Sequence, residues 1–144
     1  MLPGHSSFAL LIAMMIAVAP TGNAPAAAHE TVRPAFSEAI PNLAGKTLTS
    51  VIVTYPPGAS SKPHTHARSA YIYAFVISGA IRSKVDDGPA TIYRAGESWS
   101  EAPGAHHLVS ENASKTAPAR LLAVFISDAG DNILTTPDKQ GTLP

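Results

Sequence analysis

The stretch AYIYAFVISGAIRSKVDDGP, residues 70–89, decides the fold class. Its first nine residues are largely apolar, which is typical of a buried strand, and Gly79 ends them. A second short strand is predicted at 80–85, and the run Asp86-Asp87-Gly88-Pro89 that follows is a strong turn signal. Two short strands joined by tight turns predict β structure here.

The same pattern continues on both sides of this stretch. The segment TLTSVIVTY (47–55) alternates and is β-branched, and Pro56-Pro57-Gly58 ends it. Further short strands are predicted at 90–94, 97–101, 106–112 and 120–127. No segment has the pattern of an amphipathic helix of three turns. The chain is therefore predicted to be all-β, as a sandwich or a small barrel.

Length and charge limit the function classes. A chain of 144 residues favours a single domain. Ten basic residues balance ten acidic ones, which argues against a nucleic-acid binder. The absence of cysteine excludes a disulfide scaffold, a thiolate metal site and a cysteine nucleophile.

The N-terminal residues resemble an export signal. The apolar run FALLIAMMIAVA (8–19) is shorter than the roughly 20 residues that a bilayer-spanning helix needs. Ala26 and Ala28 place small residues at the −3 and −1 positions of a signal-peptidase site. We expect cleavage after Ala28 and general secretion to the periplasm or the exterior, with a buried core helix as the alternative.

The mature chain then divides into three parts. Residues 29–46 are predicted as a polar N-terminal lead-in, residues 47–127 as the barrel, and residues 128–144 as a polar, poorly ordered tail.

Four histidines form two tight groups, His64-Thr65-His66 and His106-His107. On a strand, residues i and i+2 face the same side at about 6.5 Å, so His64 and His66 can take adjacent positions around one metal ion. A third histidine from a distant strand would complete a face of the coordination sphere. The alternative is that these are loop histidines with ordinary hydrogen bonds.

Two motifs resemble those of the cupin superfamily. The segment GASSKPHTH (58–66) matches the first cupin motif, which Gly79 closes two residues later than usual. The segment GESWSEAPGAHH (96–107) resembles the second motif, with its proline displaced by one place to Pro103. This resemblance covers residues 47–127 and implies a double-stranded β-helix barrel of jelly-roll type, with a divalent metal held inside by the motif histidines.

Within the second group, His107 is the predicted metal ligand. Its offset matches the cupin motif, and strand alternation would then turn Val109 inward with it and His106 outward.

The resemblance includes one departure. The glutamate that usually follows the second histidine is replaced by Ala70 or Tyr71, so a metal would be held by three neutral imidazoles. The chain is in this respect similar to three-histidine cupins that act as dioxygenases. Their outer carboxylate and arginine correspond by offset to Glu101 and Arg82, which are therefore candidate catalytic residues. A solvent-facing position or a structural ion pair is the alternative for each, and a site that binds no metal is the alternative for the cluster.

These implications predict a metal-dependent, dioxygenase-like enzyme that acts on a small chelating or enolisable substrate. Fe(II) is the favoured cofactor, and Mn, Ni, Cu or Zn would also suit imidazole ligands. The alternatives are a non-catalytic module that binds a metal or small ligand, and a metal-assisted lyase or isomerase. Three aromatic residues would line the cavity or belong to the core: Tyr71, Tyr73 and Trp99. A homodimer is compatible with a small barrel of this type.

Overall fold

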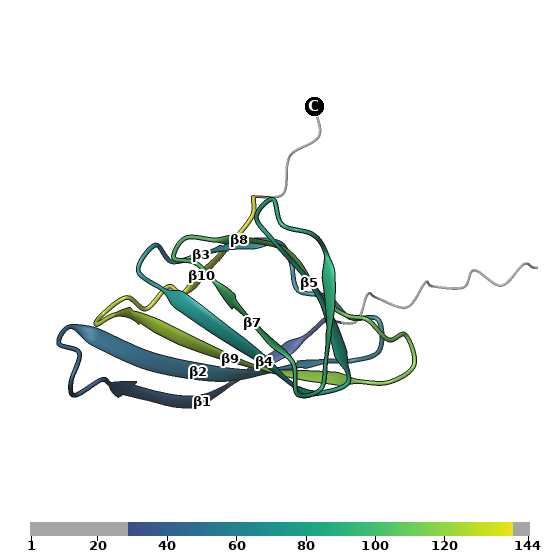
Figure 1. Ribbon diagram of the computed structural model, residues 1–144, viewed down its shortest axis with the longest axis horizontal. Coiled ribbons are helices and arrows are strands. Elements are labelled where there is room, and N and C mark those ends of the chain that lie inside the picture. Colours follow the sequence, from purple (N-terminus) through teal and green to yellow (C-terminus); the bar gives the residue numbers. More distant parts are fainter. Residues whose placement is uncertain (1–28, 140–144) are drawn as a thin grey trace, which may run out of the picture.

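Residues 29–139, the part of the chain that the computed structural model describes, fold into short strands joined by turns (Figure 1). In chain order these are β1 (Thr31–Ala39), β2 (Lys46–Tyr55), β3 (His64–His66), β4 (Tyr71–Ser78), β5 (Ala80–Val85), β6 (Thr91–Arg94), β7 (Ser98–Glu101), β8 (His106–Asn112), β9 (Ala119–Asp128) and β10 (Thr135–Pro137). The predicted signal peptide, residues 1–28, lies outside the described residues. Between residues 29 and 139 no helix is long and apolar enough to cross a membrane.

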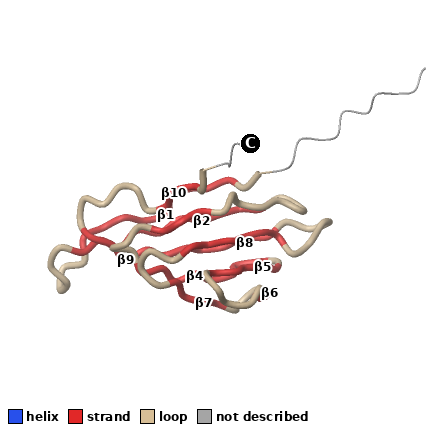
Figure 2. Tube along the Cα trace, turned by 90° about the horizontal axis from the view of Figure 1, so that it is seen from above, coloured by secondary structure: helices blue, strands red, loops and turns tan. Residues whose placement is uncertain are grey.

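The strands form two five-stranded antiparallel sheets. One sheet has the order β1-β2-β9-β4-β7, and the other has the order β10-β3-β8-β5-β6. Figure 2 shows the strands running alongside one another, with loops gathered at the two ends. The all-β jelly-roll barrel expected from the sequence is confirmed.

The core lies between the two sheets and follows from strand alternation. In β9 every second residue from Ala119 to Ser127 is buried, and the residues between them are more exposed. β2 pairs with β9 over its whole length, which places Val53 and Tyr55 on the same inner face. Alternate residues of each strand point to the same side of a sheet, so the buried, mostly apolar residues of β2 and β9 form one inner face.

Two strands lie where the sequence did not indicate any. β1 lies in the predicted polar lead-in, and all nine of its residues are exposed at the edge of a sheet. β10 lies in the predicted poorly ordered tail and pairs with β3. Neither strand buries a regular apolar face, so neither leaves the alternating signal that strand prediction depends on.

The turn between β4 and β5 depends on Gly79, whose φ is +74°. A Cβ at this position would lie 2.7 Å from the carbonyl oxygen of Pro118 and 2.9 Å from the Cα of Ala119. We expect Gly79→Ala to lower the free energy of unfolding by more than the roughly 1–2 kcal/mol of left-handed strain, because backbone atoms must also move.

The matched control for this change is Gly58→Ala. Gly58 has a φ of +70° but open space where a Cβ would lie, so it carries the conformational strain without the clash. Denaturant unfolding of both variants measures the difference. Equal losses of stability would contradict a tight approach at Gly79.

Candidate metal centre

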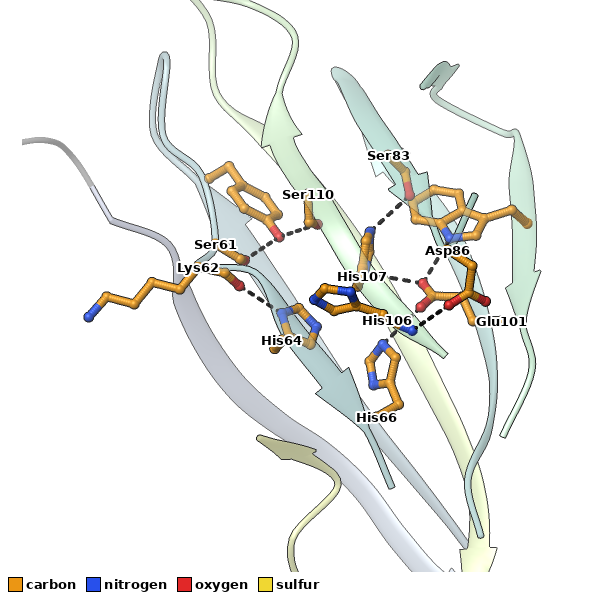
Figure 3. Close-up of polar contacts among 12 residues, drawn as sticks. Ser61, Lys62, His64, His66, Ser83, Asp86, Glu101, His106, His107 and Ser110 are labelled. Atoms are coloured by element: carbon orange, nitrogen blue, oxygen red, sulfur yellow. Dashed lines mark hydrogen bonds and ion pairs between the residues drawn. The ribbon is translucent and has the colours of Figure 1, made fainter. Parts of the chain in front are cut away.

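Three histidines from two neighbouring strands converge inside the barrel (Figure 3). His64 and His66 lie at the ends of β3, and His107 lies on β8, where it pairs directly with His64. One ring nitrogen from each of the three lies within 4.8 Å of the others. His66 and His107 are buried, and His64 is half-buried. The sequence-predicted set is thus brought together, with one member close to solvent.

A bulge in β8 aims His107 at this cluster. Val85 pairs with His107 and Lys84 with Val109, which leaves Leu108 as an extra residue without a partner. Beyond the bulge it is Ser110 that faces the interior, where it lines the cavity. The expectation that Val109 turns inward together with His107 is therefore wrong, because an extra residue reverses the alternation.

His106 faces away from the cluster, as predicted. Its backbone N–H donates to Asp86 Oδ1 at 2.8 Å, and its Nε2 lies 2.8 Å from Asp138 Oδ2. These contacts hold His106 on the outside of the strand.

Burial keeps two of the three imidazoles neutral, which is the form that binds metals, and each has one ring nitrogen against a neighbouring oxygen. His64 Nδ1 donates to the carbonyl oxygen of Lys62 at 2.8 Å, which leaves the lone pair of Nε2 free. His107 Nε2 lies 2.9 Å from Ser83 Oγ. Burial lowers the pKa of His64, and it lowers the pKa of His107 to about 4. Both rings are therefore neutral at physiological pH.

Glu101 at the end of β7 lies against the same histidines. Its Oε2 is 2.8 Å from His66 Nε2, its Oε1 is 3.3 Å from His107 Nδ1, and the Trp99 indole donates to Oε1 at 2.9 Å. Burial alone would raise the pKa of Glu101, but its contacts with His66 and His107 outweigh that effect and lower it. The side chain is a buried carboxylate held by three partners.

Several polar atoms of the cluster have no aligned hydrogen bond. Both ring nitrogens of His66 and Oε2 of Glu101 are buried without one, since the short approach between Nε2 and Oε2 lacks hydrogen-bond alignment. Buried polar atoms are nearly always satisfied in folded proteins. A divalent cation would satisfy one ring nitrogen of His66, and three imidazoles are ligands that such ions accept. The residues present therefore fit a metal ion.

The cluster opens onto a cavity of about 200 Å³ between the sheets. Its walls are mostly apolar, with side chains such as Val53, Ile72 and Phe125. Among the polar lining groups is Tyr55, whose hydroxyl lies 2.8 Å from Ser61 Oγ and 2.8 Å from Ser110 Oγ. Burial raises the pKa of Tyr55, so it is a neutral phenol. The sequence does not mark Tyr55 as a functional residue, because a tyrosine at the end of a strand is usual.

Arg82 is not brought to the cluster. Its guanidinium Nη2 lies 2.7 Å from Glu111 Oε1, and its side chain is 43% exposed. Its neighbours Ile81 and Ser83 on β5 are buried, so alternation turns Arg82 outward. Arg82 therefore forms a structural ion pair, which was the alternative to a catalytic role in the sequence-based prediction.

The three aromatic candidates lie in different places. Tyr71 and Tyr73 are exposed and do not line the cavity. Trp99 stacks on Tyr93, with ring centroids 4.5 Å apart. It reaches the site through its hydrogen bond to Glu101 and an edge-on approach to the ring of His107, with centroids 6.4 Å apart.

A match to a protein-family model shows the family of this chain. The model described as "Cupin domain" matches residues 51–125. The chain belongs to the cupin family. No curated protein matches this cupin in sequence.

Solved structures with the same fold include enzymes and proteins of other kinds. The cupin is similar to TT1209 from Thermus thermophilus (20% identity, TM-score 0.55, 69% of this chain and 84% of that one). It is also similar to an RmlC-like cupin from Methanocaldococcus jannaschii (14%, 0.55, 74% and 88%). A third is oxalate oxidase in complex with glycolate (23%, 0.55, 74% and 55%), so the cupin spans about half the length of that enzyme. At sequence identities this low, the similarity to these three structures shows a shared fold alone.

Proposed function

We propose that this cupin is an exported, metal-dependent enzyme of dioxygenase type that acts on a small chelating or enolisable substrate, with Fe(II) as the favoured ion. The observation that carries the proposal is the convergence of His64, His66 and His107 beside a mostly apolar cavity. Three imidazoles neutralise none of the charge of a divalent ion, which favours anionic ligands at the remaining positions. Oxalate oxidase and a DMSP lyase from Ruegeria pomeroyi are enzymes of the same fold, so the fold is compatible with an enzymatic reaction at such a site.

The three histidines would hold the ion, and neighbouring groups orient them. When bound, the ion supplies Lewis acidity, redox chemistry with dioxygen and open positions for a chelating substrate. Lys62 fixes the ring of His64 through its carbonyl oxygen, and Ser83 fixes that of His107. The apolar cavity walls exclude water and accommodate the carbon skeleton of a small substrate.

Glu101 is the residue placed to move a proton. It is a buried carboxylate beside the cluster, and Trp99 fixes one of its oxygens. A carboxylate in this position accepts a proton from an enolisable carbon or hydroxyl group and returns it later in the cycle.

Oxygen uptake tests this function. The protein loaded with Fe(II) is supplied with a panel of β-diketones and flavonols, and dioxygen consumption is followed with an electrode. The proposal expects uptake that depends on both metal and substrate. Turnover that continues without dioxygen would contradict it, and binding without turnover would indicate a non-catalytic module.

A metal-assisted lyase or isomerase is the second candidate, and Tyr55 favours it. A neutral phenol held by Ser61 and Ser110 inside the cavity is a proton donor that a non-oxidative reaction can use. This function expects anaerobic turnover that Tyr55→Phe lowers while metal content is unchanged. Turnover that stops when dioxygen is removed would contradict this second function.

Export is proposed from the sequence of residues 1–28 and has its own test. N-terminal sequencing of the protein recovered from outside the cytoplasm is expected to begin at His29 or a near neighbour. A full-length, membrane-embedded product would contradict the proposal.

A further inference from the structure

A second cavity adjoins the cavity of the metal centre at His64. It has a volume of about 400 Å³, and its walls come from the residues before β1, the loop before β3, β3 itself and β10. Ser61, His64 and Thr135 line both cavities. A ligand of an ion at His64 can therefore extend in two directions, inward along the apolar walls of the inner cavity and outward into this second cavity, the outer pocket.

The outer pocket is polar, in contrast to the inner cavity. Apart from Pro137, every residue that lines it has a polar side chain. Two of these residues carry a full charge, Glu30 and Lys62. Lys62 is exposed, and Figure 3 shows its side chain directed away from His64. Glu30 is half-buried, so the charge that remains at the pocket is negative.

The backbone on both sides of Glu30 fixes its position. The preceding residue, His29, forms a β-bridge with Ser60, which in turn forms a bridge with Glu111 on β8. The following residue, Thr31, begins β1 and pairs with β2. Glu30 therefore lies where the chain passes from contacts with one sheet to pairing within the other.

The carboxylate of Glu30 has no counter-charge. Within residues 29–139, no basic side chain forms an ion pair with it. Its charge also acts inside the barrel. Burial raises the pKa of Tyr55 in the inner cavity, and the negative charge of Glu30 raises it further. A half-buried carboxylate without a counter-charge attracts a cationic group.

We propose that the outer pocket binds a cationic group of the substrate, and that the substrate of this cupin is a zwitterion. This inference rests on the proposed function, in which an anionic chelating group binds the ion held by the three histidines. The ammonium group of the same molecule pairs with Glu30, and its apolar part packs in the inner cavity. Glu30 lies outside residues 51–125, which match the cupin model, so this selectivity belongs to the N-terminal segment of this chain.

Two chelators of equal length test the proposal. Butyrohydroxamic acid and β-alanine hydroxamic acid can bind a divalent ion through the same two oxygen atoms, and the second has an ammonium group where the first has a methyl group. The dissociation constant of each is measured on the full chain loaded with Co(II), whose visible absorption responds to its ligands. Comparison of wild type with Glu30→Gln cancels the intrinsic difference between the two chelators.

Glu30→Gln is expected to weaken the binding of β-alanine hydroxamic acid about 5-fold or more, because the ammonium group loses its counter-charge. The binding of butyrohydroxamic acid should not change. Glu30→Lys should go further and make the ammonium compound the weaker ligand of the two. An unchanged ratio of the two dissociation constants in Glu30→Gln, or an equal loss for both chelators, would overturn the proposal.

The matched control is Glu38→Gln. Glu38 is an exposed glutamate at the other end of β1 that lines neither the inner cavity nor the outer pocket. Its replacement makes the same change in net charge and should leave both dissociation constants as they are in the wild type. A loss in Glu38→Gln equal to that in Glu30→Gln would show a general charge effect and would overturn the assignment of the pocket.

Butyrohydroxamic acid also separates this inference from the proposed function. If the Co(II)-loaded wild-type protein binds neither hydroxamic acid, the ion has no open positions for a chelating substrate, and both proposals fail. If it binds butyrohydroxamic acid and Glu30→Gln leaves the ratio unchanged, the zwitterionic substrate alone is ruled out.

Discussion

Replacing His64, His66 or His107 by alanine is expected to abolish stoichiometric metal binding. One nitrogen from each ring lies within 4.8 Å of the others, so each removal leaves only two imidazole ligands. Two ligands hold a divalent ion far more weakly than three. The metal content of each purified variant, measured by elemental analysis after loading with Fe(II), gives the result.

His106→Ala is the matched control for this set. It removes an imidazole from the residue next to His107, on the same strand, but from the outer side, where the ring contacts Asp138. We expect it to retain most of the metal. If His106→Ala loses the metal and His107→Ala keeps it, the assignment of the ligands is wrong. Circular dichroism on every variant separates loss of a ligand from loss of the fold.

Glu101→Gln is expected to keep the metal and to lower turnover by about 10²-fold or more, the usual scale for a positioned acid–base group. Glutamine has nearly the shape of glutamate, and its amide oxygen can still accept the hydrogen bond from Trp99. It can no longer take up a proton. Metal content and kcat measured on the same preparation separate the two effects.

The control for Glu101→Gln is Glu111→Gln. Glu111 is a half-buried carboxylate on β8 that pairs with Arg82 outside the cavity, and its change should affect neither metal content nor turnover. Loss of metal in Glu101→Gln would make Glu101 a direct ligand. Unchanged metal and unchanged turnover would remove Glu101 from the chemistry.

The histidine cluster was predictable from the sequence because its geometry is local. His64 and His66 are two residues apart on one strand, and alternation alone turns both to the same side. The positions of the next two histidines agree with the choice of His107 over His106, since the first lies in the cluster and the second faces outward.

The features that were missed depend on contacts between distant strands. The unpaired Leu108 reverses the alternation of β8, so Ser110 takes the inward position expected for Val109. Nothing in the local sequence marks a bulge, which arises from pairing with β5. The outward position of Arg82 was missed for a similar reason. Its offset from the motif does not show which face of β5 its side chain takes.

The edge strand β1 was missed for a different reason. Its residues are all exposed, so no apolar period marks it, and its pairing with β2 supplies the order. The face of the sheet on which its residues Glu38 and Arg33 lie follows only from the register of β1 with β2.

Elemental analysis of the wild-type protein, isolated from the compartment in which it accumulates, tests the central claim most directly. We expect one divalent ion per chain, lost on dialysis against a strong chelator and restored by Fe(II). The claim would be contradicted by a correctly folded protein that contains no metal and takes up none of Fe(II), Mn(II), Ni(II), Cu(II) or Zn(II).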